Sequence, residues 1–108
     1  MSQEYLGEFE QMVLLSIIRL GDDAYGLRIR DELEAVAGRS PSSGALYTTL
    51  DRLERKNLID SSRGESSRER GGRPRRYVRV TPEGQALLAS SRHRLLALWT
   101  GIEESLGG

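Results

Sequence analysis

Hydroxyl side chains and arginine recur along residues 42–59, a segment with the sequence SSGALYTTLDRLERKNLI. Leu46, Leu50 and Leu53 are spaced four and three residues apart, so they fall on one face of a helix and leave polar residues on the others. Hydroxyls can hydrogen-bond to several base edges, and an arginine can bind guanine through two parallel hydrogen bonds. We therefore predict a helix that contacts DNA through Ser42, Ser43, Tyr47, Thr48, Thr49 and Arg52.

These residues have different expected roles. Ser42 is expected to cap the first turn, where free amides and the positive end of the helix dipole favour a phosphate. Tyr47 lies beside the leucine face, and its phenol either touches phosphate or closes the core. Arg52 is the one good candidate for guanine. The side chains expected to face the major groove are Ser43, Thr48, Thr49 and Arg52.

A second set of candidate DNA contacts lies in an arginine-rich segment. The formal net charge of the chain is +0, but residues 63–79 carry seven arginines against two glutamates, while residues 1–37 carry eight acids against three arginines. Each phosphate that an arginine neutralises releases counterions, so binding would depend steeply on salt. A solvated charged surface, or a chance likeness of GGRP to an AT-hook, is the alternative. The candidate contacts are Arg68, Arg70, Arg73 and Arg75.

The arginines are expected to lie on a β-hairpin. The run RRYVRVT alternates, which places Tyr77 with Arg75 and Arg79 on one face and Arg76, Val78 and Val80 on the other. An earlier segment, LIDSSR, precedes the polar, glycine-rich GESSRERGGRP. We predict two antiparallel strands with a loose tip, which is a wing that follows the DNA-contacting helix.

Two helices are predicted before residues 42–59. The first covers residues 8–20 and is apolar on most sides, so most of its sides must be covered by other parts of the fold. The second covers about residues 24–37, with Asp22 or Asp23 as its N-cap and Gly38 at its end. Gly26 in its first turn indicates a close approach by another helix. A short link that contains Gly38 and Pro41 joins this second helix to the helix predicted in residues 42–59. Two helices joined in this way are typical of a helix-turn-helix.

A long final helix is predicted from Thr81, its N-cap, to about Leu106. Roughly 25 residues at 1.5 Å each give a rod of about 37 Å, too long to be buried wholly on a small domain. Its apolar residues follow a nearly heptad pattern that is typical of pairing with a symmetry mate. The residues expected in this homodimer interface are Leu88, Leu95, Trp99, Ile102 and Leu106.

Composition excludes several classes of function. The chain has no cysteine and one histidine, His93, and it shows no nucleophile–base pair or phosphate-binding loop, so we predict no metal, no cofactor and no enzyme. No apolar run approaches the roughly 20 residues of a membrane span. The acidic N-terminus argues against a signal peptide, which makes a cytoplasmic location the expectation.

The segments together resemble the PadR-like bacterial transcriptional regulators, in particular short members with a single C-terminal helix. The resemblance covers nearly the whole chain, through GDDAYG, SSGALYTTLDRLERKNLI and GGRPRRYVRVTPEG. Asn57 stands where such proteins often carry Gly, and the wing tip holds an extra SSRER. The resemblance implies a dimeric winged helix-turn-helix that represses transcription from an inverted repeat. Some relatives release DNA when they bind an aromatic effector.

These inferences give a mainly α fold with a small β-hairpin. Residues 1–80 are expected to form the winged helix-turn-helix domain and residues 81–108 the dimerisation helix. The predicted function is a DNA-binding repressor that binds double-stranded DNA as a homodimer. The alternative is a winged-helix module for protein contacts. If a small aromatic effector binds, the expected pocket residues are Phe9, Met12, Val13 and Trp99.

Overall fold

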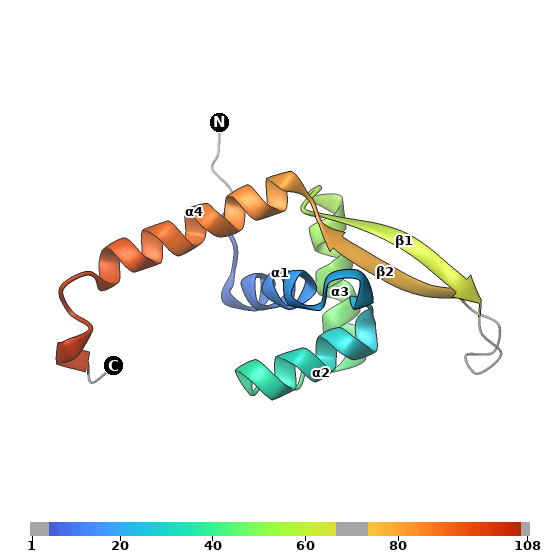
Figure 1. The fold of residues 1–108 in the computed structure, drawn as a ribbon, viewed down its shortest axis with the longest axis horizontal. Helices are drawn as coiled ribbons and strands as arrows, with labels where there is room; N and C mark the ends of the chain where they lie inside the picture. The colour runs from blue at the N-terminus through green and yellow to red at the C-terminus, as the bar shows by residue number, and fades with distance from the viewer. Residues whose placement is uncertain (1–4, 67–73, 107–108) are drawn as a thin grey trace.

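A computed structural model describes residues 5–66 and 74–106 of the chain. Three helices form the body, an antiparallel hairpin projects from it, and the last helix extends away on the opposite side (Figure 1). The predicted fold class is confirmed. In chain order the elements are α1 Glu8–Leu20, a 3-10 turn Gly21–Asp23, α2 Gly26–Ala37, α3 Ser43–Arg55, β1 Ile59–Ser66, β2 Pro74–Val80, α4 Pro82–Trp99 and a 3-10 turn Glu104–Leu106.

The core lies where the three helices meet the base of the hairpin. Leu46, Leu50 and Leu53, the predicted apolar face of α3, are at most 1% exposed. Burial of each such side chain contributes about 1.5–3 kcal/mol to the hydrophobic stabilisation. The other core residues include Val13, Leu14 and Ile17 of α1, Ile29 and Leu33 of α2, and Ile59, Val78 and Val80 of the hairpin.

The limits of α3 follow from local chemistry, as predicted. The Ser42 hydroxyl accepts a hydrogen bond from the Ala45 amide at 3.0 Å, which caps the first turn. At the other end Asn57 has a φ of 65°, a left-handed conformation that asparagine tolerates and that turns the chain into β1. The recognition segment is therefore a helix with fixed ends.

The start of α2 differs from the prediction. Asp22 and Asp23 lie in the 3-10 turn, and Tyr25 is the N-cap residue without a side-chain capping bond. The reason lies in the hairpin. The Ala24 carbonyl accepts a hydrogen bond from the Val78 amide at 3.0 Å, and Tyr25 forms a β-bridge with Tyr77. This pairing keeps the chain extended through Tyr25, so the helix begins at Gly26.

The final helix is shorter than predicted. It begins at Pro82 under the Thr81 cap, as expected, but it ends at Trp99, where Gly101 adopts a φ of 88°. Its 18 residues give a length of about 27 Å. Ile102 and Leu106 therefore lie beyond the helix, and the predicted seam does not continue through them as one helical stripe. Among the helices of residues 5–66 and 74–106, none has the length and hydrophobicity that a membrane span requires.

Candidate nucleic-acid interface

The face of α3 opposite the leucines is polar and open to solvent. Ser43 and Thr48 are exposed, as predicted for residues that face DNA, and Tyr47 is 44% exposed. Two further exposed residues, Asp51 and Arg55, lie three and seven positions after Thr48, which places them on the same face. They were not among the predicted contacts, although their spacing from Thr48 places them on its face of the helix.

Thr49 does not face outward. Its side chain is 4% exposed, and its hydroxyl donates a hydrogen bond to the Ala45 carbonyl at 3.0 Å. The predicted orientation of Thr49, toward the outward face of α3, is therefore wrong. Thr49 follows Leu46 by three residues, so it falls at the edge of the packed face, and bonding to its own helix satisfies the hydroxyl in the core.

Arg52 also departs from its predicted orientation. Its Nε donates to the Glu10 carboxylate of α1 at 3.0 Å, which holds the guanidinium toward α1 rather than on the outward face. Lys56 donates to the same carboxylate oxygen at 3.2 Å. Arg55, in contrast, has no hydrogen bond or ion pair within the described residues. Arg55 is thus a better candidate than Arg52 for a contact with DNA.

Glu10 joins the start of α1 to the end of α3. One of its carboxylate oxygens accepts a hydrogen bond from the Gly7 amide at 3.0 Å, and the other binds Arg52 and Lys56. Burial alone would raise the pKa of the Glu10 carboxyl, but these three hydrogen bonds outweigh it, so the pKa lies below its ordinary value. The charged form of Glu10 therefore stabilises the position of α3 against α1.

Glu10→Gln should lower the free energy of unfolding at pH 7 by about 1 kcal/mol, because it removes the charge that Arg52 and Lys56 bind. The loss is no larger because both side chains stay partly exposed, so water screens the interaction. A carboxyl whose pKa is lowered by folding stabilises the folded state above its unfolded pKa, near about pH 4, and this contribution is lost as the pH falls. Urea denaturation should show the difference from wild type shrinking at low pH. Glu8→Gln, in the same turn and 81% exposed, is the control. A deficit of equal size at both pH values would contradict the role of the Glu10 charge.

Tyr47 lies across the start of α2. A Cβ atom at Gly26 would contact the Tyr47 hydroxyl and lie 3.0 Å from its Cζ atom. The predicted close approach of another helix at Gly26 is therefore confirmed. Of the two roles left open for Tyr47, packing is shown directly, while its half-exposed ring stays available to a partner.

The hairpin is antiparallel, as predicted, with Ile59 opposite Val80 and Ser61 opposite Val78. Val78 and Val80 are buried, and the Arg75 guanidinium lies 4.1 Å from the centre of the Tyr25 ring. Arg75 therefore packs on the face of the hairpin predicted for it. Arg68, Arg70 and Arg73 lie outside the described residues. Arg63 and Arg79, which are exposed on the described strands, are additional candidate contacts.

Arg76 connects the hairpin to α3. Its guanidinium donates to Asp51 at 2.9 Å, to Glu54 at 2.7 Å and to the Ser61 hydroxyl at 3.0 Å. Hydrogen bonds from Ser61 and then from Arg76 lower the pKa of the Glu54 carboxyl. The wing is thus held against the C-terminal half of α3 by charge-assisted hydrogen bonds.

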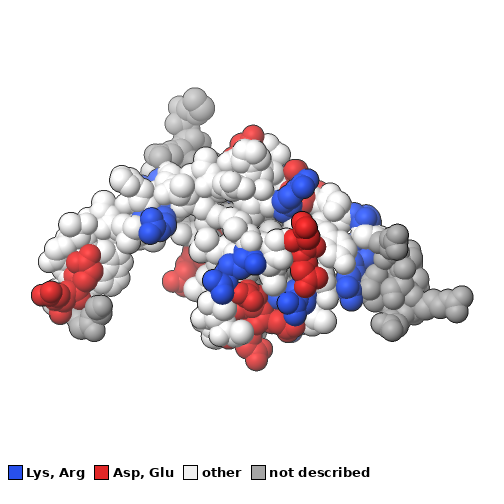
Figure 2. Space-filling view, viewed as in Figure 1, with Lys and Arg blue, Asp and Glu red and all other residues white. Residues whose placement is uncertain are grey.

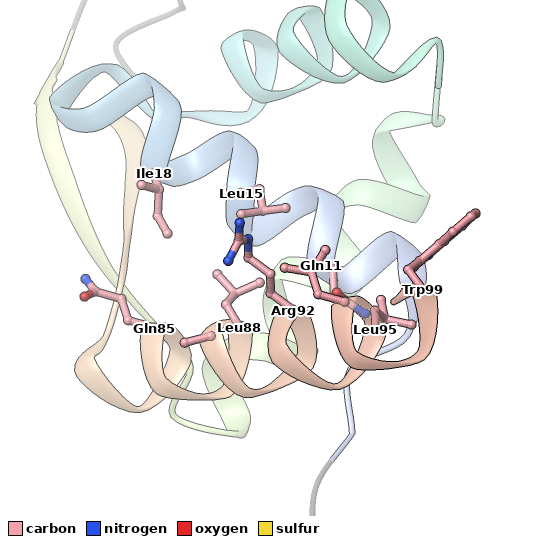
Figure 3. A pocket seen from close by; sticks show the side chains of 10 residues that line it. Gln11, Leu15, Ile18, Gln85, Leu88, Arg92, Leu95 and Trp99 are labelled. Carbon is pink, nitrogen blue, oxygen red and sulfur yellow. The ribbon is translucent and has the colours of Figure 1, made fainter. Parts of the chain in front are cut away.

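A groove of about 560 Å³ lies between α1 and α4, remote from α3. Leu15 and Ile18 point from α1 toward α4, where Leu88, Leu95 and Trp99 line the other side (Figure 3). Leu15, Ile18, Leu95 and Trp99 are each 43–49% exposed. The face of the α4 arm seen in Figure 2 carries few charges before its acidic end. The described chain therefore leaves a large apolar surface uncovered.

The predicted effector pocket is only partly recovered in this groove. Trp99 lines it, but Val13 is fully buried in the core. Phe9 and Met12 do not line the groove and instead contact Arg39, whose guanidinium lies 5.2 Å from the Phe9 ring centre and 3.9 Å from the Met12 sulfur. The residues of α1 that line the groove are Gln11, Leu15 and Ile18. Because the helix is apolar on most sides, its sequence did not show which side faces the groove.

No group of His, Cys, Asp and Glu side chains in the described ranges is arranged to hold a metal ion.

Comparison with known proteins gives the family. The model of the transcriptional regulator PadR-like family matches residues 14–90. No protein of curated function matches the chain.

Solved structures agree with the family match. A PadR family transcription regulator from Clostridium difficile is 26% identical with a TM-score of 0.70, over 91% of this chain and 98% of that chain. A PadR-like transcriptional regulator from Bacillus cereus is 25% identical with a TM-score of 0.71, over 93% and 92%. One from Eggerthella lenta is 28% identical with a TM-score of 0.67, over 92% and 86%. With its winged fold and this match over most of its length, the chain belongs to the PadR-like family of transcriptional regulators.

Proposed function

We propose that the protein is a homodimeric repressor that binds an inverted-repeat DNA operator. The observation that carries the proposal is the polar outward face of α3 with Ser43, Thr48 and Arg55, which lies beside an arginine-bearing hairpin. A helix of this kind contacts base edges, while hairpin arginines neutralise phosphates. The sign of regulation and a bacterial source rest on the resemblance to PadR-like repressors, and action on DNA implies a cytoplasmic location.

The apolar groove between α1 and α4 supports the dimer. We assign residues 1–80 to DNA binding and residues 81–108 to dimerisation. Leu95, Leu96 and Leu98 lie within one turn of α4 and are 47–75% exposed, a pattern that water disfavours unless a partner covers it. A twofold axis that relates two copies of α4 would place two copies of α3 on two half-sites of one operator.

A small aromatic effector would bind in the same groove. Trp99 offers a flat ring, Arg92 a cation and Gln11 an amide, which suits a planar ligand with a polar edge. Binding there would change the packing of α1 against α4 and hence the spacing of the two DNA-binding units. Trp99 is the single tryptophan of the chain, so its fluorescence reports on this site specifically.

Removal of two wing arginines should weaken the salt dependence of binding. Duplexes selected from a random pool supply the operator, and affinity is then measured at several salt concentrations. Arg73→Ala with Arg75→Ala should reduce the slope of log affinity against log salt by about 2, since each lost phosphate contact removes about 0.9. Arg19→Ala, on the side of α1 that binds Glu32, is the control and should leave the slope unchanged.

The same measurement separates the two candidate functions. Recovery of an inverted repeat would support the repressor. An unchanged slope in the double variant would remove the wing arginines from the interface. Absence of salt-sensitive binding to any duplex would favour the alternative, a winged-helix module for protein contacts.

A further inference from the structure

An acidic side chain lies on the DNA-facing surface of the recognition helix. Asp51 is three residues after Thr48 and four before Arg55, so the three side chains share the outward face of α3. The Asp51 side chain is 58% exposed. Because phosphates repel a carboxylate, an acid at this position opposes DNA binding unless its charge is compensated and its acceptor atoms are used.

Arg76 compensates the charge and fixes the direction of the carboxylate. Its Nη1 atom donates to the Oδ1 atom of Asp51 at 2.9 Å, and its side chain is only 23% exposed. Within the described residues, the Oδ2 atom of Asp51 has no hydrogen bond. One oxygen is therefore anchored to the wing, and the other remains a free acceptor on the outward face.

Glu54 differs from Asp51 although it binds the same arginine. Its Oε1 atom accepts hydrogen bonds from both Arg76 and the Ser61 hydroxyl, so both of its contacts lead to the wing. Glu54 therefore attaches the hairpin to α3 through two hydrogen bonds, beside the buried contacts of Ile59, Val78 and Val80. The bond from Arg76 to Asp51 adds to this attachment and also orients the Asp51 carboxylate.

We propose that Asp51, positioned by Arg76, is a specificity-determining residue that accepts a hydrogen bond from the amino group of a cytosine in the major groove. A carboxylate only accepts hydrogen bonds, so it selects a donor on a base edge. Adenine also offers an amino group, but its N7 acceptor lies beside that group and would repel the carboxylate. Cytosine presents its amino donor without that neighbour. The proposal rests on the proposed function.

The base preference of the protein tests this assignment. Selection from a random pool with wild type should recover a cytosine at one position of each half-site, preferred about 5- to 150-fold over other bases. Asp51→Ala should erase the preference at that position alone and, because a repulsive charge is removed, raise the affinity for unrelated duplexes. Arg76→Gln should relax the same position, since Asp51 is then no longer oriented.

Two controls separate base recognition from charge and from the attachment of the wing. Asp31→Ala removes one exposed aspartate charge from α2 and should leave every base preference unchanged. Glu54→Gln weakens the attachment and should keep the cytosine preference. A selected operator whose base preferences are the same for wild type and Asp51→Ala would overturn the role of Asp51 and leave the proposed function intact. Failure of wild type to select any sequence would overturn both.

Discussion

Trp99→Glu should convert the proposed dimer into a monomer. Trp99 borders the apolar groove near Leu15 and Leu95, and its side chain is 43% exposed in the single chain. Buried aromatic residues dominate the energy of such interfaces, and truncation of one commonly costs about 2 kcal/mol or more. A carboxylate in the same place also loses its hydration when the interface covers it. The dimer dissociation constant should therefore rise by more than about 30-fold, measured by light scattering over a dilution series.

Loss of the dimer should also weaken operator binding. A dimer that has bound one half-site holds its second α3 at a high effective concentration near the other half-site, which increases affinity by about 10²–10⁴. The Trp99→Glu monomer should lose most of this gain. Its affinity for a single half-site should remain unchanged, because Trp99 is the last residue of α4 and that end of the helix lies away from α3 (Figure 1).

Val36→Glu is the matched control for this prediction. Val36 is 60% exposed on α2, so the substitution adds the same charge at an exposed apolar position outside the groove. This variant should remain a dimer. A stable dimer of Trp99→Glu with an intact helical spectrum would place the interface elsewhere on the molecule.

Local rules predicted the parts of the fold that depend on short sequence separation. The spacing of Leu46, Leu50 and Leu53 determined which face of α3 packs, because a helical period places them together. Ser42 and Thr81 cap their helices through hydrogen bonds that span three residues. These features could be found in the sequence because the interacting residues are neighbours along the chain.

Contacts between distant residues limited the prediction of the site. Arg52 binds Glu10 across 42 residues, and periodicity contains no information about that pairing. Thr49 is buried because the packed face of α3 is wider than its three leucines, and the hydroxyl bonds to its own helix. Arg52 and Thr49 therefore do not belong to the outward face of α3. Asp51 and Arg55, which were not predicted, lie on that face instead.

The apolar character of α4 was predicted from the sequence, but the length of the helix and the exposure of each residue were not. The heptad spacing indicated that α4 leaves an apolar surface for another chain, and the exposed Leu95 and Trp99 agree with it. The helix ends at Trp99 because Thr100 leaves the helical conformation and Gly101 then takes a positive φ, and a single glycine only weakly specifies a backbone turn of this kind. Leu88, the first residue of the predicted seam, is only 8% exposed, since it packs within the chain's own core.

Gly84→Ala should lower the free energy of unfolding by about 2 kcal/mol, although alanine normally stabilises a helix. A Cβ atom at Gly84 would contact the Leu58 carbonyl oxygen and lie 2.7 Å from Cγ1 of Val80. The Leu58 carbonyl cannot move away freely, because it accepts a hydrogen bond from the Thr81 amide at 3.0 Å. Overpacking of this kind costs about 1–3 kcal/mol, more than the gain of up to about 1 kcal/mol from helix propensity.

Gly44→Ala provides the matched control, because a Cβ atom there meets no other atom within 4 Å and the residue also lies in the first turn of a helix. That substitution should raise the free energy of unfolding by about 0.5–1 kcal/mol. Urea denaturation at one fixed protein concentration compares both variants with wild type, since dimerisation would otherwise add to the measured stability. Stabilisation by both substitutions would show that α4 does not pack closely on the start of β1. Opposite signs would confirm that this contact, rather than helix propensity, requires glycine at position 84.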